Sequence, residues 1–169
     1  MMKNTKLLRE IIGYLLGGVV FVGAMPALMW LVSGMPTIVH IGVLRASLTG
    51  LLVASGLTLS VWAIVYMRRK GDGNPMDAFN HEVAPRTKHL MTDGPYRLSR
   101  NPMLTGIFLY LVGCCVWLGT WQSAVFFAAF VLIMLLQVRS EEKRLLRDFG
   151  DEYEAYCKNT GRFWPKKLR

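Results

Sequence analysis

Charged residues are scarce in this sequence: they make up 18% of its 169 residues, whereas hydrophobic residues make up 53%. Soluble domains of this size carry more charge and fewer apolar residues, so the composition excludes an ordinary soluble protein. The charges are also clustered, and none lies in residues 11–32, 46–67 or 102–138. Such segregation is expected when long stretches of a single domain lie in a lipid bilayer, where an unpaired charge is costly.

Cysteine is rare as well, with three residues in the chain. Cys114 and Cys115 are adjacent inside an apolar run, and Cys157 lies alone in the charged tail. This arrangement excludes a disulfide framework, and it lacks the paired Cys or Cys/His spacing of a metal site. We therefore predict three free thiols and no metal.

Acidic residues are few, because 11 Asp and Glu stand against 20 Lys and Arg, giving a net charge of +9. Positive charge of this size could indicate nucleic-acid binding, but the basic residues flank the apolar stretches. In that position Lys and Arg set membrane topology and contact anionic lipids. We expect membrane lipids as partners and no nucleic acid.

The long apolar runs predict an all-α integral membrane protein with four transmembrane helices. The predicted spans are residues 11–32, 46–67, 102–118 and 121–138. A signal peptide is the alternative interpretation of the first span. Because its apolar run is long and no clear cleavage site follows, we expect a retained helix kinked near Pro26. Gly119 and Thr120 alone separate the last two spans, which predicts a tight hairpin.

Charge placement predicts the orientation of these spans. With four crossings, the N-terminus, residues 68–101 and the C-terminal tail share one side and hold 19 of the 20 basic residues, with Arg45 opposite. The positive-inside rule places that side in the cytoplasm, and we expect the protein in the plasma (inner) membrane. The fourth helix is expected to continue to Phe149 and to end at Gly150, followed by a short interfacial helix.

One polar segment, residues 88–106, combines turn and helix-start signals. Gly94 and the following proline favour a turn, and Asn101-Pro102 favours the first positions of a helix. Backbone N–H groups at a helix start attract an anion, and Arg97 and Arg100 add positive charge. The same residues are equally compatible with a plain helix cap whose two arginines contact lipid phosphates.

A second polar segment follows the fourth span. Arg139 and Glu142 are three residues apart and can pair on one helix face, while Glu141 points about 100° away. In isolation, the simpler interpretation is a solvated face on which both glutamates pair with Lys143, Arg144 and Arg147. Because the hairpin turn lies on the far side, however, residues 97–103 and 137–144 are expected to lie close together.

Together, the two segments suit a ligand that carries both charges. S-adenosylmethionine has a carboxylate for the arginines, an ammonium group for a glutamate, a positive sulfonium and an apolar adenine. The charges of the two segments therefore favour a cytoplasmic site for this cofactor, built from residues 68–101 and 139–165.

The order of motifs across residues 68–165 resembles the isoprenylcysteine carboxyl methyltransferase-like family and its phospholipid methyltransferase relatives. The matching residues are Gly94 to Arg97, Arg100-Asn101-Pro102, Gly106, Glu141-Glu142, Phe149-Gly150, Tyr153, Tyr156 and Arg162-Phe163-Trp164-Pro165. The resemblance implies S-adenosylmethionine as cofactor and S-adenosylhomocysteine as product. It implies that the cofactor site contains His89, Leu90, Gly94, Tyr96, Arg97, Arg100, Asn101, Pro102, Glu141 and Glu142, with a glycine-containing loop at residues 71–73 before it.

The chain departs from the family pattern at two positions. Asn101 occupies a position that is often His, and Leu104 one that is often aromatic. Residues 78–85 are longer than the usual connection and are expected to contribute to the acceptor entrance. These departures keep a non-catalytic membrane scaffold as an alternative, because a fold does not determine its function.

Methyl transfer from a sulfonium depends mainly on holding donor and acceptor in line in a dry site. We expect a lipophilic acceptor whose apolar tail enters from the bilayer, with Arg139 as its contact and Glu142 as an anchor of the cofactor. A carboxylate acceptor needs no base, whereas an amine needs one, for which Glu142 or His81 is available. O-methylation of an isoprenylcysteine carboxylate and N-methylation of a phospholipid or small molecule therefore both remain open, as does the oligomeric state.

Overall fold

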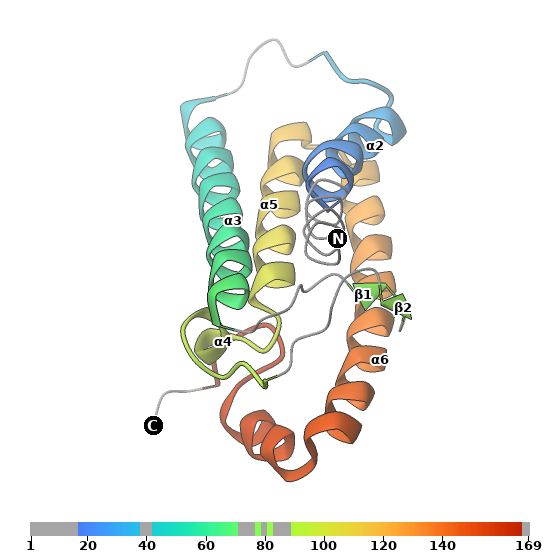
Figure 1. Ribbon diagram of the computed structural model, residues 1–169. Helices are drawn as coiled ribbons and strands as arrows, with labels where there is room; N and C mark the ends of the chain where they lie inside the picture. Colours follow the sequence, from blue (N-terminus) through green and yellow to red (C-terminus); the bar gives the residue numbers. More distant parts are fainter. Residues whose placement is uncertain (1–16, 38–41, 71–76, 79–80, 83–88, 167–169) are drawn as a thin grey trace, which may run out of the picture.

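The computed structural model describes residues 17–37, 42–70, 77–78, 81–82 and 89–166. Its elements are the π-helix η1 (Gly18–Ala24), α2 (Met25–Val32), α3 (Val43–Lys70), α4 (Pro95–Leu98), α5 (Pro102–Leu118), α6 (Trp121–Asn159) and the antiparallel two-residue strands β1 (Asp77–Ala78) and β2 (His81–Glu82). The all-helical class is confirmed. In Figure 1, α2, α3, α5 and the first part of α6 run side by side, while α4 and the end of α6 lie together at one end.

Two of the described helices, α3 and α6, are long and apolar enough to cross a membrane. The span predicted at 46–67 lies within α3, and the helix predicted at 102–118 has the bounds of α5. The apolar helices at Gly18–Val32 and Pro102–Leu118 are shorter. The four-span topology and its orientation therefore stay predictions, and residues 11–16, 71–76 and most of 78–85 lie outside the described part of the chain.

Helices α3 and α5 are antiparallel and pack backbone against backbone. A Cβ atom at Gly56 would lie 2.5 Å from both the carbonyl oxygen of Gly106 and the amide nitrogen of Tyr110. The Ser60 hydroxyl donates to the carbonyl of Met103 at 2.9 Å. Small residues at a crossing allow this close approach, and in an apolar surrounding such packing is the main source of helix association.

The connection from α5 to α6 consists of the two residues that the sequence predicted. Gly119 adopts a left-handed conformation (φ 61°) and its N–H donates to Cys115, which closes the last turn of α5. The side chain of Thr120 accepts from the amide of Ser123 as the N-cap of α6. The crossing of a bilayer by α5 and α6 as a hairpin stays a prediction.

Arg45 lies beside this connection. Its Nε donates to the carbonyl of Val116 at 2.7 Å, and its Nη2 donates to the carbonyl of Trp117 at 2.6 Å. The last carbonyls of a helix have no partner within the helix and carry partial negative charge. The basic residue predicted to lie apart from all the others therefore has a structural role.

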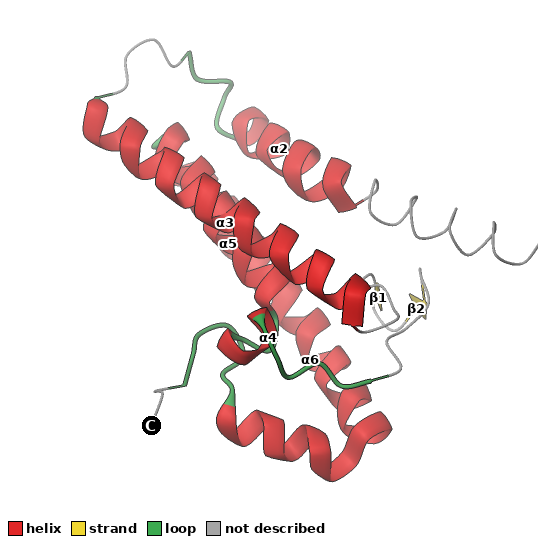
Figure 2. Cartoon of the chain, turned by 60° about the vertical axis from the view of Figure 1, so that its left-hand side comes forward, coloured by secondary structure: helices red, strands yellow, loops and turns green. Residues whose placement is uncertain are grey.

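The helix α6 bends at Gly150, whose backbone angles (φ 50°, ψ −124°) are not helical. Figures 1 and 2 show its last part, residues 151–159, turning back beneath the bundle. The predicted end of the fourth helix at Gly150, followed by a short helix, is therefore confirmed. Directly before α2, which contains Pro26, the chain is π-helical over η1, and the kink expected near Pro26 stays a prediction.

Candidate functional site

The polar end of the molecule is organised around buried tyrosines. Gly94 has a conformation (φ 56°, ψ −126°) open to glycine, and a side chain there would collide with the ring of Tyr66. This turn starts α4 and buries Tyr96 against Tyr153 and Tyr156. The Tyr156 hydroxyl donates to the carbonyl of Tyr96 at 2.6 Å. Burial raises the pKa of both Tyr153 and Tyr156 above the ordinary tyrosine value.

The chain after α6 returns to the start of α5. The amide of Arg100 donates to the carbonyl of Gly161 at 2.9 Å, and the carbonyl of Arg162 accepts from Ser99 Oγ at 3.0 Å and Asn101 Nδ2 at 3.2 Å. Asn101 occupies the predicted N-cap position, but its side chain makes no cap bond. The predicted N-cap position of Asn101, with Pro102 at the start of α5, is therefore confirmed, while the side-chain amide binds the C-terminal segment.

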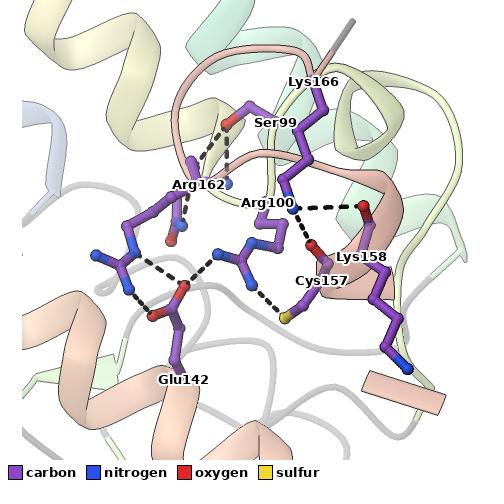
Figure 3. Close-up of polar contacts among 8 residues, drawn as sticks. Ser99, Arg100, Glu142, Cys157, Lys158, Arg162 and Lys166 are labelled. Carbon is purple, nitrogen blue, oxygen red and sulfur yellow. Dashed lines mark hydrogen bonds and ion pairs between the residues drawn. The ribbon is translucent and has the colours of Figure 1, made fainter. Parts of the chain in front are cut away.

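Glu142 joins three distant segments of the chain (Figure 3). Its Oε1 lies 3.0 Å from Arg100 Nη2 and accepts from Arg162 Nε at 3.0 Å, and its Oε2 accepts from Arg162 Nη2. The two hydrogen bonds from Arg162 to the Glu142 carboxylate raise the pKa of Arg162 above the ordinary arginine value. The helical spacing predicted Arg139 as the partner, yet the ion pairs of Glu142 run to Arg100 and Arg162.

Arg100 is the most enclosed cation of this group, with 13% of its side chain exposed. Its Nη1 donates to Cys157 Sγ, and its guanidinium lies 6.0 Å from the ring centre of Tyr153. The buried Nε has no hydrogen-bond partner. A buried guanidinium nitrogen without an acceptor is costly.

Two cavities meet at Arg100. One, of about 130 Å³, is lined in part by the predicted residues Tyr96, Arg100, Asn101, Pro102 and Glu141. The other is an open groove of about 620 Å³, in part lined by Arg100 with the predicted residues Arg139 and Glu142. The expected proximity of residues 97–103 and 137–144 is confirmed by these contacts. Glu141 and Glu142 face different cavities, as their angular separation on a helix requires.

Four of the predicted cofactor residues line neither cavity. His89 and Arg97 are exposed, and Leu90 packs against the tyrosine cluster. Gly94 acts in the turn before α4, as described above. Glu141 also pairs with Arg144 at 3.5 Å. For Glu141, the pairing with a nearby basic residue of the same helix that the sequence suggested is therefore present.

Sequence reasoning left Arg162, Tyr153 and Cys157 out of the predicted site. All three line the open groove, and Arg162 supplies two of the donors that hold Glu142. Arg162 and Tyr153 stood in the quoted motifs, so their fixed positions in the pattern were the available signal. Nothing in the sequence distinguished Cys157 from an isolated surface thiol.

A third cavity, of about 440 Å³, extends the site away from the polar end. Its walls are mainly apolar and come from η1, α3 and α5. It shares Phe21, Met103 and Ile107 with the cavity at Arg100. A polar pocket and an apolar groove therefore adjoin through common walls, an arrangement suited to a ligand with a charged end and an apolar tail.

Comparison with known proteins places these features in a family. The chain is 32% identical over 99 residues to a protein-S-isoprenylcysteine O-methyltransferase of Schizosaccharomyces pombe, which covers 56% of this chain and 42% of the relative. It is 31% identical over 86 residues to the nickel-cobalt-cadmium resistance protein NccN of Alcaligenes xylosoxydans xylosoxydans, covering 48% of this chain and 38% of that protein. The chain thus spans about two fifths of the length of these relatives.

The profile of the family described as phospholipid methyltransferase matches residues 44–152, which include α3, α4, α5 and most of α6. The match and the yeast relative confirm the resemblance to isoprenylcysteine methyltransferase-like proteins. Methyltransferase membership also supports an enzymatic role. The chain belongs to the phospholipid methyltransferase family.

Proposed function

We propose that this chain is a four-span integral membrane enzyme that transfers a methyl group from S-adenosylmethionine to a lipophilic acceptor. The observation that carries the proposal is the position of Arg100. It pairs with Glu142 at 3.0 Å, lines both polar cavities and keeps its Nε without an acceptor. A ligand carboxylate would satisfy that nitrogen.

The residues around Arg100 fit the charges of the cofactor. Glu141 faces the same cavity as Arg100, so one wall offers a cation for the carboxylate and another a carboxylate for the ammonium group. Tyr96 and Leu104 provide aromatic and apolar surface. A cavity of about 130 Å³ is small for a ligand of this size, so the cofactor would extend past Arg100 into the groove of about 620 Å³. When bound, it would supply an electrophilic methyl group.

The contacts of Glu142 favour O-methylation over N-methylation. Both of its oxygens already accept from guanidinium groups of Arg100 and Arg162. Taking a proton from an amine would require one of these ion pairs to break, whereas a carboxylate acceptor arrives deprotonated and needs no base. We assign Glu142 as a positioning residue for Arg100, and the acceptor as an isoprenylcysteine-like carboxylate.

The acceptor would lie across the polar and apolar cavities. Its tail would occupy the cavity of about 440 Å³ between η1, α3 and α5, entering from the bilayer. Arg139, which lines the open groove of about 620 Å³, would contact the anionic end of the acceptor. This arrangement requires the polar end on the cytoplasmic side, in agreement with the charge distribution, and we place the protein in the plasma (inner) membrane.

Binding of the cofactor is the first experiment. S-adenosylmethionine and S-adenosylhomocysteine are titrated by calorimetry into protein held in lipid nanodiscs. We expect micromolar binding that weakens about tenfold in Glu141→Gln, because one charge-assisted contact is lost, and more in Arg100→Lys. Arg147→Gln is the control, since Arg147 is exposed and lines neither polar cavity. An absence of binding in nanodiscs would contradict the proposal and favour the scaffold.

The acceptor chemistry is tested separately with methyl-labelled cofactor. S-farnesyl N-acetylcysteine and phosphatidylethanolamine vesicles are offered as acceptors, and the labelled products are treated with base. Release of volatile label identifies a methyl ester, because N-methyl groups resist base. Label that stays in the phospholipid would overturn O-methylation and assign the alternative, N-methylation of a lipid headgroup.

A further inference from the structure

Beyond the cavity assigned to the acceptor tail lies another, which the proposed function does not use. It measures about 500 Å³ and lies between α2, α3 and the end of α5, with Pro26, Trp30, Val53 and Leu118 among its walls. Tyr110 lines this far cavity and also the tail cavity of about 440 Å³. The two spaces are therefore neighbours that share one side chain.

Tyr110 is held in this position by a defect in the first helix. Pro26 has no N–H and therefore interrupts the main-chain hydrogen bonds just after the π-helical η1, near the carbonyl of Val22. The Tyr110 hydroxyl donates to that carbonyl at 2.9 Å. In an apolar surrounding a carbonyl without a donor is costly, so this bond fixes the phenol against η1.

The three residues of this contact divide the two cavities. Val22 lines the tail cavity, Pro26 lines the far cavity, and Tyr110 lines both. Along α5, the tail cavity extends from Met103 to Tyr110 and the far cavity from Tyr110 to Leu118. At 1.5 Å per residue these stretches are about 10 Å and 12 Å long, so removal of the partition would roughly double the available length.

We infer that Tyr110 is a specificity-determining residue that limits the length of the acceptor's apolar chain. The inference rests on the proposed function, because it takes the tail cavity as the site of that chain. A chain that ends before Tyr110 lies within the tail cavity along its whole length. A longer chain must bend back toward lipid or break the bond between Tyr110 and Val22, and its extra methylene groups then make no packing contacts with the protein.

The test measures tail binding without turnover. S-geranyl, S-farnesyl and S-geranylgeranyl N-acetylcysteine are bound to the full chain in nanodiscs, and each affinity is compared with that of the next longer compound. In wild-type protein we expect the gain in affinity to stop before the longest chain. In Tyr110→Ala we expect the longest chain to gain about tenfold over wild type, because its end then packs against the walls of the far cavity instead of lying in lipid.

Companion variants keep the result interpretable. Tyr110→Phe retains the ring but frees the carbonyl of Val22, and we expect a gain about threefold smaller than in Tyr110→Ala. Leu109→Ala is the control on the same helix, because Leu109 lines neither cavity. Ala27→Phe fills the far cavity, whose wall includes Ala27, and should cancel the gain when combined with Tyr110→Ala.

If Tyr110→Ala and Tyr110→Phe change the affinity for all three compounds equally, the role of Tyr110 is overturned. The same holds if the gain of Tyr110→Ala for the longest compound survives when Ala27→Phe is added. Calorimetric binding of S-adenosylmethionine is followed in the same preparations. An absence of chain-length selectivity in the wild-type protein, with cofactor binding intact, contradicts the inference alone. An absence of cofactor binding together with selective tail binding contradicts the proposed function and leaves a length-selective lipid site.

Discussion

Where α3 crosses α5, an added methyl group at Gly56 would meet backbone atoms of the opposite helix. At the polar end, by contrast, segments meet through side chains: Glu142 binds Arg100 and Arg162, and Asn101 reaches the carbonyl of Arg162. The first contact has no freedom to adjust, because it involves backbone on both sides. The second depends mainly on long side chains that can rotate, with one backbone hydrogen bond from the amide of Arg100 to the carbonyl of Gly161.

This difference separates a rigid frame from an adjustable site. Sites that must admit a ligand are commonly built from the less stable parts of a structure. Here the C-terminal segment covers the start of α5 through hydrogen bonds, and several of these bonds use Arg100 or Arg162, which also line the open groove. The frame positions α5, and the polar end is able to open around a ligand.

The largest effect should come from the frame. Gly56→Ala places a methyl group 2.5 Å from backbone atoms of Gly106 and Tyr110, so α3 and α5 must move apart. We expect a loss of roughly 3 kcal/mol in the free energy of unfolding, the upper end for overpacking. Gly50→Ala, also on α3, is the matched control because nothing lies within 4 Å of its added methyl group. Thermal unfolding in detergent measures both, and equal stability of the two variants would contradict a backbone-limited frame.

A smaller and more local effect is expected from Glu142→Gln. The change leaves Arg100 and Arg162 facing a neutral amide, and 16% of the Glu142 side chain is exposed, so the loss is about 2 kcal/mol rather than the value for a fully buried pair. Hydrogen exchange should accelerate in residues 160–166 while α3 keeps its protection. Glu152→Gln, at an exposed position, should change neither. Faster exchange throughout α3 would remove the distinction between frame and site.

The frame was largely predictable because its signals are local. Long uncharged runs gave the bounds of α5, Gly119 and Thr120 gave the connection, and Gly150 gave the bend in α6. Each of these depends on one or two residues with special backbone preferences. The contact between Gly56 and Gly106 was not predicted, because many small residues lie in these helices and sequence does not pair them.

The site was predicted less completely because its contacts join distant segments. Glu142 was identified, but its partner Arg162 lies beyond the bend at Gly150, where helical spacing gives no guidance. Arg97 and Arg100 look equivalent in sequence, yet α4 leaves the first exposed and encloses the second. Spacing predicts neighbours on one helix, whereas side-chain contacts between segments depend on the turns between them.

Arg45 tests whether one charged side chain can stabilise the frame. Arg45→Ala removes two donors from the carbonyls of Val116 and Trp117 at the end of α5. Because the guanidinium is partly exposed, we expect a loss of about 1.5 kcal/mol, with a smaller loss in Arg45→Lys, which keeps the charge. Thermal unfolding of the three proteins gives the order. If Arg45→Ala is as stable as wild type, the helix end is satisfied by water.

The smallest effect concerns the tyrosines of the polar end. Tyr156→Phe removes the hydrogen bond to the carbonyl of Tyr96, a loss of about 1 kcal/mol. Burial raises the pKa of Tyr153 and Tyr156, so the folded protein retains these protons more tightly than the unfolded chain. The resulting stability is complete below about pH 10 and falls as the pH rises through the tyrosine range. Unfolding temperatures measured from about pH 8 to pH 11 should therefore fall less steeply in Tyr156→Phe than in wild type. Parallel curves would show that alkaline loss of stability arises outside the tyrosine cluster, and the polar end would then owe its stability mainly to the ion pairs of Glu142.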